Sequence, residues 1–130
     1  MTSDDVVIDI EQIKAIDFKI AERHFSHKEI CDLNEKQNSE ELEYFYNLWT
    51  LKESYIKACG KGLSIPLNSF GIRINKSIGI DFYTESELKT CFFKLYKIDQ
   101  EYKLSVCSTK NLFSSKVVYK ILSDIIKVMR

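Results

Sequence analysis

Five charged residues of this chain are of the types that together hold a divalent cation and a polyphosphate. Three are acidic and two are basic: Asp9, Glu11, Glu53, Lys52 and Lys57. In proteins, Mg²⁺ is bound by one or a few carboxylates, and waters and phosphate oxygens complete its shell. Ammonium groups neutralise phosphate charge. The five residues therefore predict a site for Mg²⁺ and a phosphate-bearing ligand.

Asp9 and Glu11 lie in a segment with the alternation of a β-strand, in which they alternate with Ile8 and Ile10. Side chains two residues apart on a strand point to the same face, roughly 6–7 Å apart along the chain. Two carboxylates at this spacing repel one another unless a cation or water separates them. The alternative interpretation is an acidic strand face in contact with solvent.

The other three charged residues fall in a segment with the periodicity of a long helix, from about Ser39 to Cys59. Ser39 is a suitable N-cap and Gly60 is a natural stop. Lys52 falls inside the apolar arc of this helix, where an ammonium without a partner is costly. The apolar residues recur at about 100° per residue and are Leu42, Phe45, Leu48, Trp49, Leu51, Tyr55, Ile56 and Cys59.

Glu53 and Lys57 share one stripe of that helix, because residues four apart are neighbours on a helix surface. A Glu–Lys surface pair is the alternative for these two residues, and a side chain that extends out to solvent is the alternative for Lys52. The segment Gly60-Lys61-Gly62 follows, and its glycines let the backbone approach a ligand closely. Lys61 is thus a further candidate for a phosphate contact, although a helix C-cap explains the glycines equally well.

The order and spacing of these segments resemble those of the surfactin-type 4'-phosphopantetheinyl transferases, which activate carrier proteins. Val7 stands where that family usually has glycine before its first signature. The resemblance covers nearly the whole chain and is clearest from about Val6 to Phe70. The matching segments are residues 8–11 (IDIE), 25–29 (FSHKE), 49–57 (WTLKESYIK) and 60–67 (GKGLSIPL).

The resemblance implies an α+β fold, in which an antiparallel sheet packs on one long helix and the acids of the first strand face that helix. Residues 1–130 would form a single domain, similar to the second half of a two-half enzyme. Because the first half normally supplies part of the coenzyme A pocket, we expect either a fragment or a homo-oligomer that completes its own site. The shorter holo-acyl-carrier-protein synthases build their sites between identical subunits.

The resemblance also implies a reaction, in which a serine hydroxyl of an apo carrier protein attacks the β-phosphate of coenzyme A. The 4'-phosphopantetheine arm moves to the serine, and adenosine 3',5'-bisphosphate leaves. Carried over residue by residue, Asp9, Glu11 and Glu53 hold Mg²⁺, and Glu53 is also the candidate to activate the hydroxyl. Lys57 would stabilise charge on the leaving phosphate. The phosphates of the coenzyme would be contacted by Lys52, Lys57 and Lys61.

Three classes of carrier fit this reaction, which are the fatty acid, polyketide and nonribosomal peptide carriers. One alternative function is a non-catalytic half that only binds coenzyme A or a carrier protein. Another is a metal-dependent phosphoester hydrolase, for which the sequence offers no His-rich or two-metal pattern. Transfer of the arm to a carrier protein distinguishes the transferase from both.

The composition of the chain fits a cytoplasmic globular protein of one domain, given 130 residues. The 19 basic and 19 acidic residues cancel, which gives no indication of a nucleic-acid partner. No apolar run approaches membrane-spanning length, and the polar start is unlike a signal peptide. The four cysteines are expected to be buried thiols, with Cys91 and Cys107 in strand-like segments that could be neighbours. His24 and His27 lack a third ligand nearby and predict no zinc site.

The rest of the chain divides into short helices and hairpins. We expect one helix over residues 17–24 and a second that begins at Ser26, with Glu29 completing a capping box. In the second helix, Ile30 and Leu33 fit either the helix core or a contact with the carrier protein. After Pro66 the patterns predict two hairpins and a C-terminal helix, at residues 70–74 with 78–82, 91–98 with 102–107, and 116–129.

Overall fold

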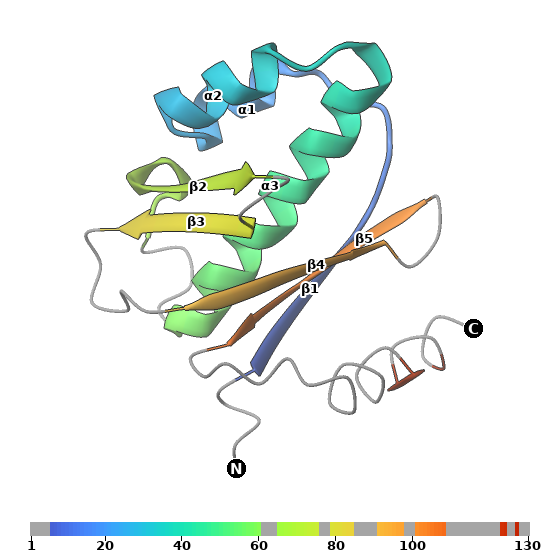
Figure 1. Cartoon of the computed structure of the whole chain (residues 1–130), viewed down its shortest axis with the longest axis vertical. Coiled ribbons are helices and arrows are strands. Elements are labelled where there is room, and N and C mark those ends of the chain that lie inside the picture. The colour runs from blue at the N-terminus through green and yellow to red at the C-terminus, as the bar shows by residue number, and fades with distance from the viewer. Residues whose placement is uncertain are drawn as a thin grey trace.

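Two antiparallel sheets and one long helix position the predicted site (Figure 1). The computed structural model describes residues 6–60, 65–75, 79–84, 91–97, 101–108, 123–124 and 127. Its elements in chain order are β1 (Val6–Gln12), α1 (Lys19–His24), α2 (His27–Asn34), α3 (Asn38–Cys59), the 3₁₀ helix η3 (Leu67–Ser69), β2 (Phe70–Asn75), β3 (Gly79–Thr84), β4 (Phe92–Lys97) and β5 (Tyr102–Ser108).

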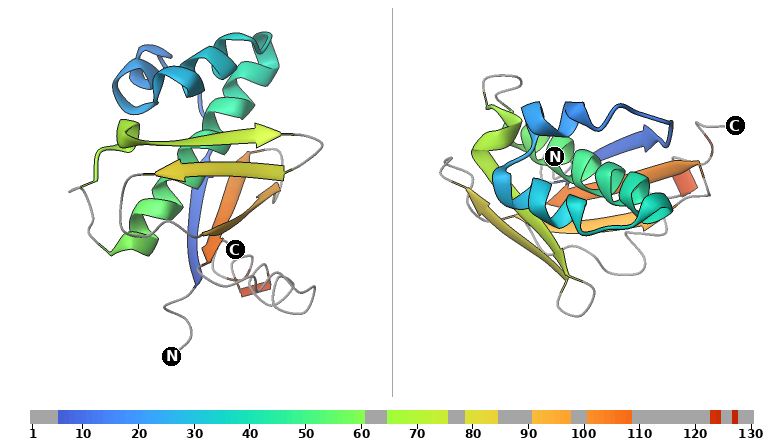
Figure 2. Two further views of the ribbon diagram at one scale, coloured as in Figure 1. Left: turned by 60° about the vertical axis from the view of Figure 1, so that its left-hand side comes forward. Right: turned by 90° about the horizontal axis from the view of Figure 1, so that it is seen from above.

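β5 is the central strand of the larger sheet, and β1 and β4 pair with it on either side. β2 and β3 form a separate two-stranded sheet. Figure 2 shows the β2–β3 hairpin running across α3, whereas β1 and β5 run roughly along it. Both predicted hairpins are confirmed, but the expectation of a single sheet is wrong. Alternation within a strand predicts which face is buried, and it does not predict which hairpins join one sheet.

α3 packs against strands of both sheets and forms the centre of the core. Leu48, Leu51 and Tyr55 on this helix are fully buried. The Tyr55 ring lies 4.7 Å from the ring of Phe70 in β2 and 6.5 Å from that of Phe93 in β4. The apolar arc read from the sequence is therefore the face that joins the two sheets.

The predicted end of α3 is confirmed, and its predicted start is wrong by about two residues. Gly60 ends the helix in a left-handed conformation with a φ of 69°, which glycine adopts without a steric penalty. At the other end, Gln37 is the N-cap and Asn38 the first helical residue. The Glu40 amide already donates to the Gln37 carbonyl oxygen, so Ser39 lies inside the first turn.

The helices before α3 follow the sequence-based expectations. Ser26 and Glu29 form the predicted capping box at the start of α2. Leu33 is buried and Ile30 packs against the same core, which favours the core interpretation of both. The predicted helix at 116–129 falls largely outside the described residues. Only residues 123, 124 and 127 of that segment are described, and all three are helical. Among the described helices, none is long and apolar enough to cross a membrane.

Candidate active site

Asp9 lies in a buried position on β1, beside β5, and its side chain faces α3. It lies opposite Ser105 in the sheet register and is 3% exposed. The Ser105 hydroxyl donates to the Thr50 carbonyl oxygen at 2.6 Å, which joins the sheet to α3. From the last turn of α3, the Lys57 ammonium donates to Asp9 Oδ1, also at 2.6 Å. The structure thus confirms that Asp9 faces the long helix.

The carboxyl groups of Asp9, Glu11 and Glu53 lie close enough to affect one another's ionisation. Burial raises the pKa of Glu11, and the charges of Asp9 and Glu53 raise it further. Burial likewise raises the pKa of Glu53, and the Asp9 charge adds to that shift. For Asp9, burial raises the pKa against the smaller effect of its hydrogen bond to Lys57. The three predicted acids share one electrostatic environment, in which Lys57 lowers the pKa of each.

One oxygen of this cluster has no donor in the described part of the chain. Asp9 Oδ2 is buried and accepts no hydrogen bond there. The Glu11 carboxyl reaches Asp9, but two carboxyl groups can bond to one another only while one of them carries a proton. When both are ionised, the Asp9 oxygen is a buried acceptor in need of a cation or a donor.

The donor chemistry of the cluster fits Mg²⁺, which prefers carboxylate oxygens. The present arrangement of the side chains is not a finished metal site. Among the residues that the structure describes, no three or more acidic, thiol or imidazole groups are gathered closely enough to hold a metal ion. Asp9, Glu11 and Glu53 are neighbours, and their carboxyl groups would have to converge further to hold one ion.

Lys52 lies apart from this cluster, and the expectation that it contacts phosphate is corrected by its surroundings. Its side chain is fully buried. Its ammonium donates to Glu29 Oε1 at 2.7 Å and to the Phe70 carbonyl oxygen at 2.6 Å, and lies 4.2 Å from the Phe70 ring centroid. Burial lowers the pKa of Lys52, and the Glu29 carboxylate opposes that shift. Lys52 is therefore an ion-pair partner inside the core.

Glu29 is the buried partner that the sequence indicated only as part of a capping box. It is 1% exposed, and its carboxylate accepts hydrogen bonds from three donors. Besides Lys52, these are the Ser26 amide and the Ile72 amide, each at 2.8 Å. Glu29 thus joins α2, α3 and β2. A lysine inside an apolar arc signals a buried acid, but it does not reveal which acid far along the chain is the partner.

His24 is a neighbour of the cluster that the sequence did not indicate. Its ring packs edge-on against Trp49, with 5.5 Å between ring centroids, and its electrostatic effect lowers the pKa of Glu53. Trp49 also stacks on Phe45 at 5.7 Å, which makes it a core anchor. Lys61, the remaining predicted phosphate contact, lies outside the described residues.

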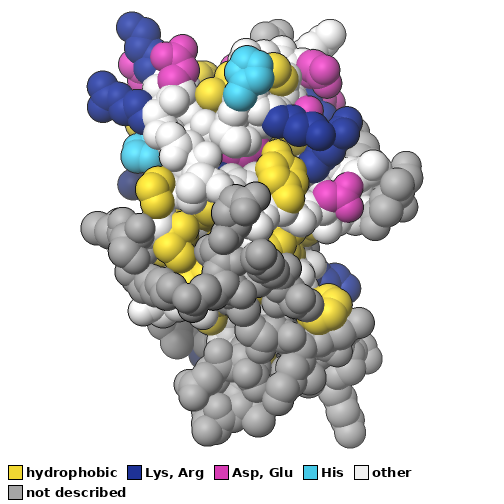
Figure 3. Space-filling model, turned by 90° about the vertical axis from the view of Figure 1, so that its left-hand side faces the viewer, with side chains coloured by type: hydrophobic (Ala, Val, Ile, Leu, Met, Phe, Trp, Pro, Cys, Tyr) yellow, Lys and Arg dark blue, Asp and Glu magenta, His cyan; other side chains and the backbone are white. Residues whose placement is uncertain are grey.

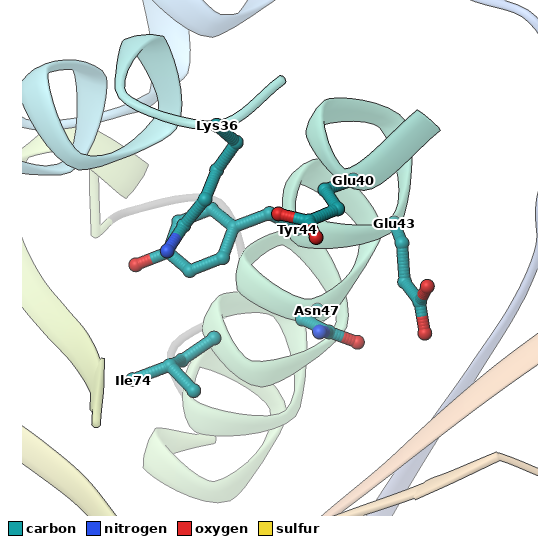
Figure 4. Close-up of a pocket in the computed structure, with 6 residues that line it drawn as sticks. All are labelled: Lys36, Glu40, Glu43, Tyr44, Asn47 and Ile74. Carbon is teal, nitrogen blue, oxygen red and sulfur yellow. The ribbon is translucent and has the colours of Figure 1, made fainter. Parts of the chain in front are cut away.

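A cavity of about 320 Å³ lies beside the other half of α3 and contains none of the predicted site residues (Figure 4). It is lined by Lys36, Glu40, Glu43, Tyr44, Asn47 and Ile74. Asn47 precedes Lys57 by ten residues, which corresponds to roughly 15 Å along the helix axis. Burial raises the pKa of Tyr44 to about 12. This cavity is separate from the carboxylate cluster.

Residues 5–107 match the family model of the 4'-phosphopantetheinyl transferase superfamily. The chain belongs to this superfamily. It is 42% identical over 115 residues to the 4'-phosphopantetheinyl transferase ffp of Bacillus subtilis, an alignment that covers 88% of this chain and 51% of that protein. It is 42% identical over 106 residues to the 4'-phosphopantetheinyl transferase Sfp of Bacillus subtilis strain 168, covering 82% and 47% respectively. The chain thus spans about half the length of these curated relatives.

Two solved structures of holo-(acyl-carrier-protein) synthases confirm the predicted fold. A holo-(acyl-carrier-protein) synthase from Bacillus anthracis, in complex with CoA (3',5'-ADP), superposes with a TM-score of 0.69 at 20% identity, over 78% of this chain and 91% of that one. The holo-[acyl-carrier-protein] synthase from Neisseria meningitidis gives a TM-score of 0.66 at 16% identity, over 82% and 98%. The α+β fold of a 4'-phosphopantetheinyl transferase half is therefore established for this chain.

Proposed function

We propose that this chain transfers the 4'-phosphopantetheine arm of coenzyme A to a serine of an apo carrier protein and releases adenosine 3',5'-bisphosphate. Its membership of the superfamily supports this activity. The observation that carries the proposal is the grouping of Asp9, Glu11, Glu53 and Lys57 between the first strand and the end of the long helix. The coenzyme bound to the structurally similar Bacillus anthracis synthase supports a coenzyme A site.

We assign Asp9, Glu11 and Glu53 as ligands of Mg²⁺. The contribution of Asp9 would be Oδ2, which has no donor among the residues that the structure describes. A bound Mg²⁺ would neutralise charge on the pyrophosphate as its bridging bond breaks. Glu53 is half-buried with a raised pKa, which makes its carboxylate a better base toward the serine hydroxyl. Because one carboxylate is poorly suited to be a tight ligand and a free base together, we place the ligand role of Glu53 first.

Lys57 is assigned to the leaving phosphate. Its side chain is 51% exposed, and its flexible stem lets the ammonium reach a ligand above the cluster. A positive group at the leaving phosphate stabilises the charge that develops there. Lys61, two residues beyond the end of α3, is proposed as a second contact to the phosphates of the coenzyme.

The coenzyme pocket would be completed by a second copy of the chain or by a further half, because the chain spans only about half of its curated relatives. We propose that the carrier protein docks beside α1 and α2. Figure 3 shows Lys, Arg and His side chains, with Asp and Glu side chains among them, at the end of the molecule where these helices lie, and Arg23, His27 and Lys28 there are exposed. A cytoplasmic setting is proposed from the four free cysteines.

Mass spectrometry of an apo carrier protein tests the activity. The wild-type chain with coenzyme A and MgCl₂ is expected to add the phosphopantetheine arm, and Glu53→Gln is expected to abolish the addition without unfolding the chain. Asp81→Asn serves as the control, because it removes an exposed carboxylate on β3. Native mass of the same samples relates activity to oligomeric state.

The alternative function is a non-catalytic half that only binds coenzyme A or a carrier protein; the chain spans about half the length of the curated relatives. It predicts that the carrier stays unmodified at every oligomeric state, while coenzyme A or the carrier still binds. Consumption of coenzyme A without modification of the carrier would instead indicate a hydrolase.

A further inference from the structure

The ion pair between Lys57 and Asp9 joins one fixed partner to one movable partner. The Asp9 side chain is 4% exposed, whereas that of Lys57 is 51% exposed. Asp9 is held by the ladder between β1 and β5, and Lys57 reaches it from the last turn of α3 with a long flexible stem. The ammonium is therefore the component that can leave while the carboxylate stays in place.

The ammonium occupies the position that a bound cation would compete for. It is bonded to Asp9 Oδ1 at 2.6 Å. The other oxygen of the same carboxylate has no donor among the described residues, and Glu11 and Glu53 add two more acidic groups beside it. Within the described residues, Lys57 is the one basic side chain paired with Asp9. The positive charge that stabilises this acidic cluster in the metal-free chain is thus supplied by Lys57.

We propose that Lys57 is a tethered counter-ion of the acidic cluster and that a divalent cation must displace it. The identity of the ligand that then receives the ammonium rests on the proposed function, in which it is a phosphate group of coenzyme A. A metal ion and an ammonium repel one another at a shared carboxylate, so Lys57 weakens the binding of the metal alone. A phosphate offers the displaced ammonium a new partner, so metal and phosphate ligand favour each other's binding.

A titration of MgCl₂ into the metal-free chain tests this role, with the amide signals of residues 6–12 followed by NMR at constant ionic strength. Lys57→Met keeps the length of the side chain and removes its charge, so it is expected to bind Mg²⁺ three- to tenfold more tightly than the wild type. Lys57→Arg keeps the competing charge and should bind as the wild type does. Lys94→Met, which removes an exposed lysine on β4, should leave the affinity unchanged.

Thermal unfolding gives a second measurement on the same variants. In EDTA, Lys57→Met leaves the acids without their counter-ion and is expected to lower the melting temperature by a few degrees. Added MgCl₂ should raise the melting temperature of Lys57→Met more than that of the wild type.

Equal or weaker Mg²⁺ binding by Lys57→Met, or no Mg²⁺ binding by any variant, overturns the inference. Neither measurement depends on carrier modification. If the wild type modifies the carrier but Lys57→Met shows no gain in Mg²⁺ affinity, the counter-ion role alone fails. If the gain is present but no carrier is modified, the proposed transferase activity alone fails.

Discussion

Replacing Lys52 by methionine is expected to destabilise the fold by about 3 kcal/mol. Methionine fills most of the same volume, but it leaves the Glu29 carboxylate without an ammonium and the Phe70 carbonyl oxygen without its donor. Loss of one partner from a buried ion pair costs about 3–5 kcal/mol. The lower end of that range applies because Glu29 keeps two backbone donors, the amides of Ser26 and Ile72.

Urea denaturation measures this effect. With a slope of about 2 kcal/mol per molar urea, a loss of 3 kcal/mol lowers the midpoint by about 1.5 M. Lys28→Met, an exposed change of the same kind, should alter the free energy of unfolding by about 0.5 kcal/mol or less. The double variant Glu29→Gln, Lys52→Met should recover part of the loss, because it buries no unpaired charge.

The structural role of Lys52 would be refuted if the free energy of unfolding of Lys52→Met lay within about 1 kcal/mol of the wild-type value and the variant also bound coenzyme A more weakly. It would mean that the ammonium reaches the ligand, as the family resemblance implies, and that the Glu29 pair contributes little to the fold.

Three further predictions concern Glu11, Tyr44 and Gly60. The pKa values of Asp9 and Glu11 are raised above their ordinary 3.8 and 4.5, so their contribution to stability is present at low pH and lost as pH rises through the folded values. In EDTA, the melting temperature of Glu11→Gln should therefore rise relative to that of the wild type as the pH is increased from about 4 to 7. A difference between the two melting temperatures that stays constant over this range would contradict the prediction. The pKa of Tyr44 is raised from 10.0 to about 12, so its contribution is intact below pH 10 and lost toward pH 12. Urea midpoints should show the wild type losing stability relative to Tyr44→Phe over that range, and parallel curves would contradict it. Gly60→Ala should cost about 1 kcal/mol in urea denaturation, because alanine disfavours the left-handed φ of 69°, and an unchanged midpoint would show that the helix end can relax.

Local patterns in the sequence were sufficient for most of the elements. The capping box at Ser26 and the left-handed stop at Gly60 each depend on residues within one helical turn. The hairpins follow from alternation on both sides of short polar breaks. Ser39 is not the N-cap because the helix begins one residue earlier, with Gln37 at the N-cap position and no side-chain hydrogen bond at that cap.

The partners of the buried charged residues could not be predicted from the sequence, because they lie in distant segments of the chain. The partner of Lys52 lies 23 positions away and that of Asp9 lies 48 positions away. A lysine in the apolar arc of a helix needs a buried partner, and the sequence shows that much. Which partner the Lys52 ammonium reaches depends on how α2 and β2 pack over α3. For the same reason the sequence placed both lysines at phosphate, whereas the fold separates Lys52 in the core from Lys57 at the acidic cluster.

The hydrogen bond from Ser105 to the backbone of α3 limits the substitutions that the acidic cluster can tolerate. Because this hydrogen bond links β5 directly to the Thr50 carbonyl oxygen, α3 cannot move toward the sheet to compensate for a shorter side chain on β1. Glu11→Asp would therefore leave a gap that the backbone does not close. Selection on such a site would act on side-chain length as strictly as on charge.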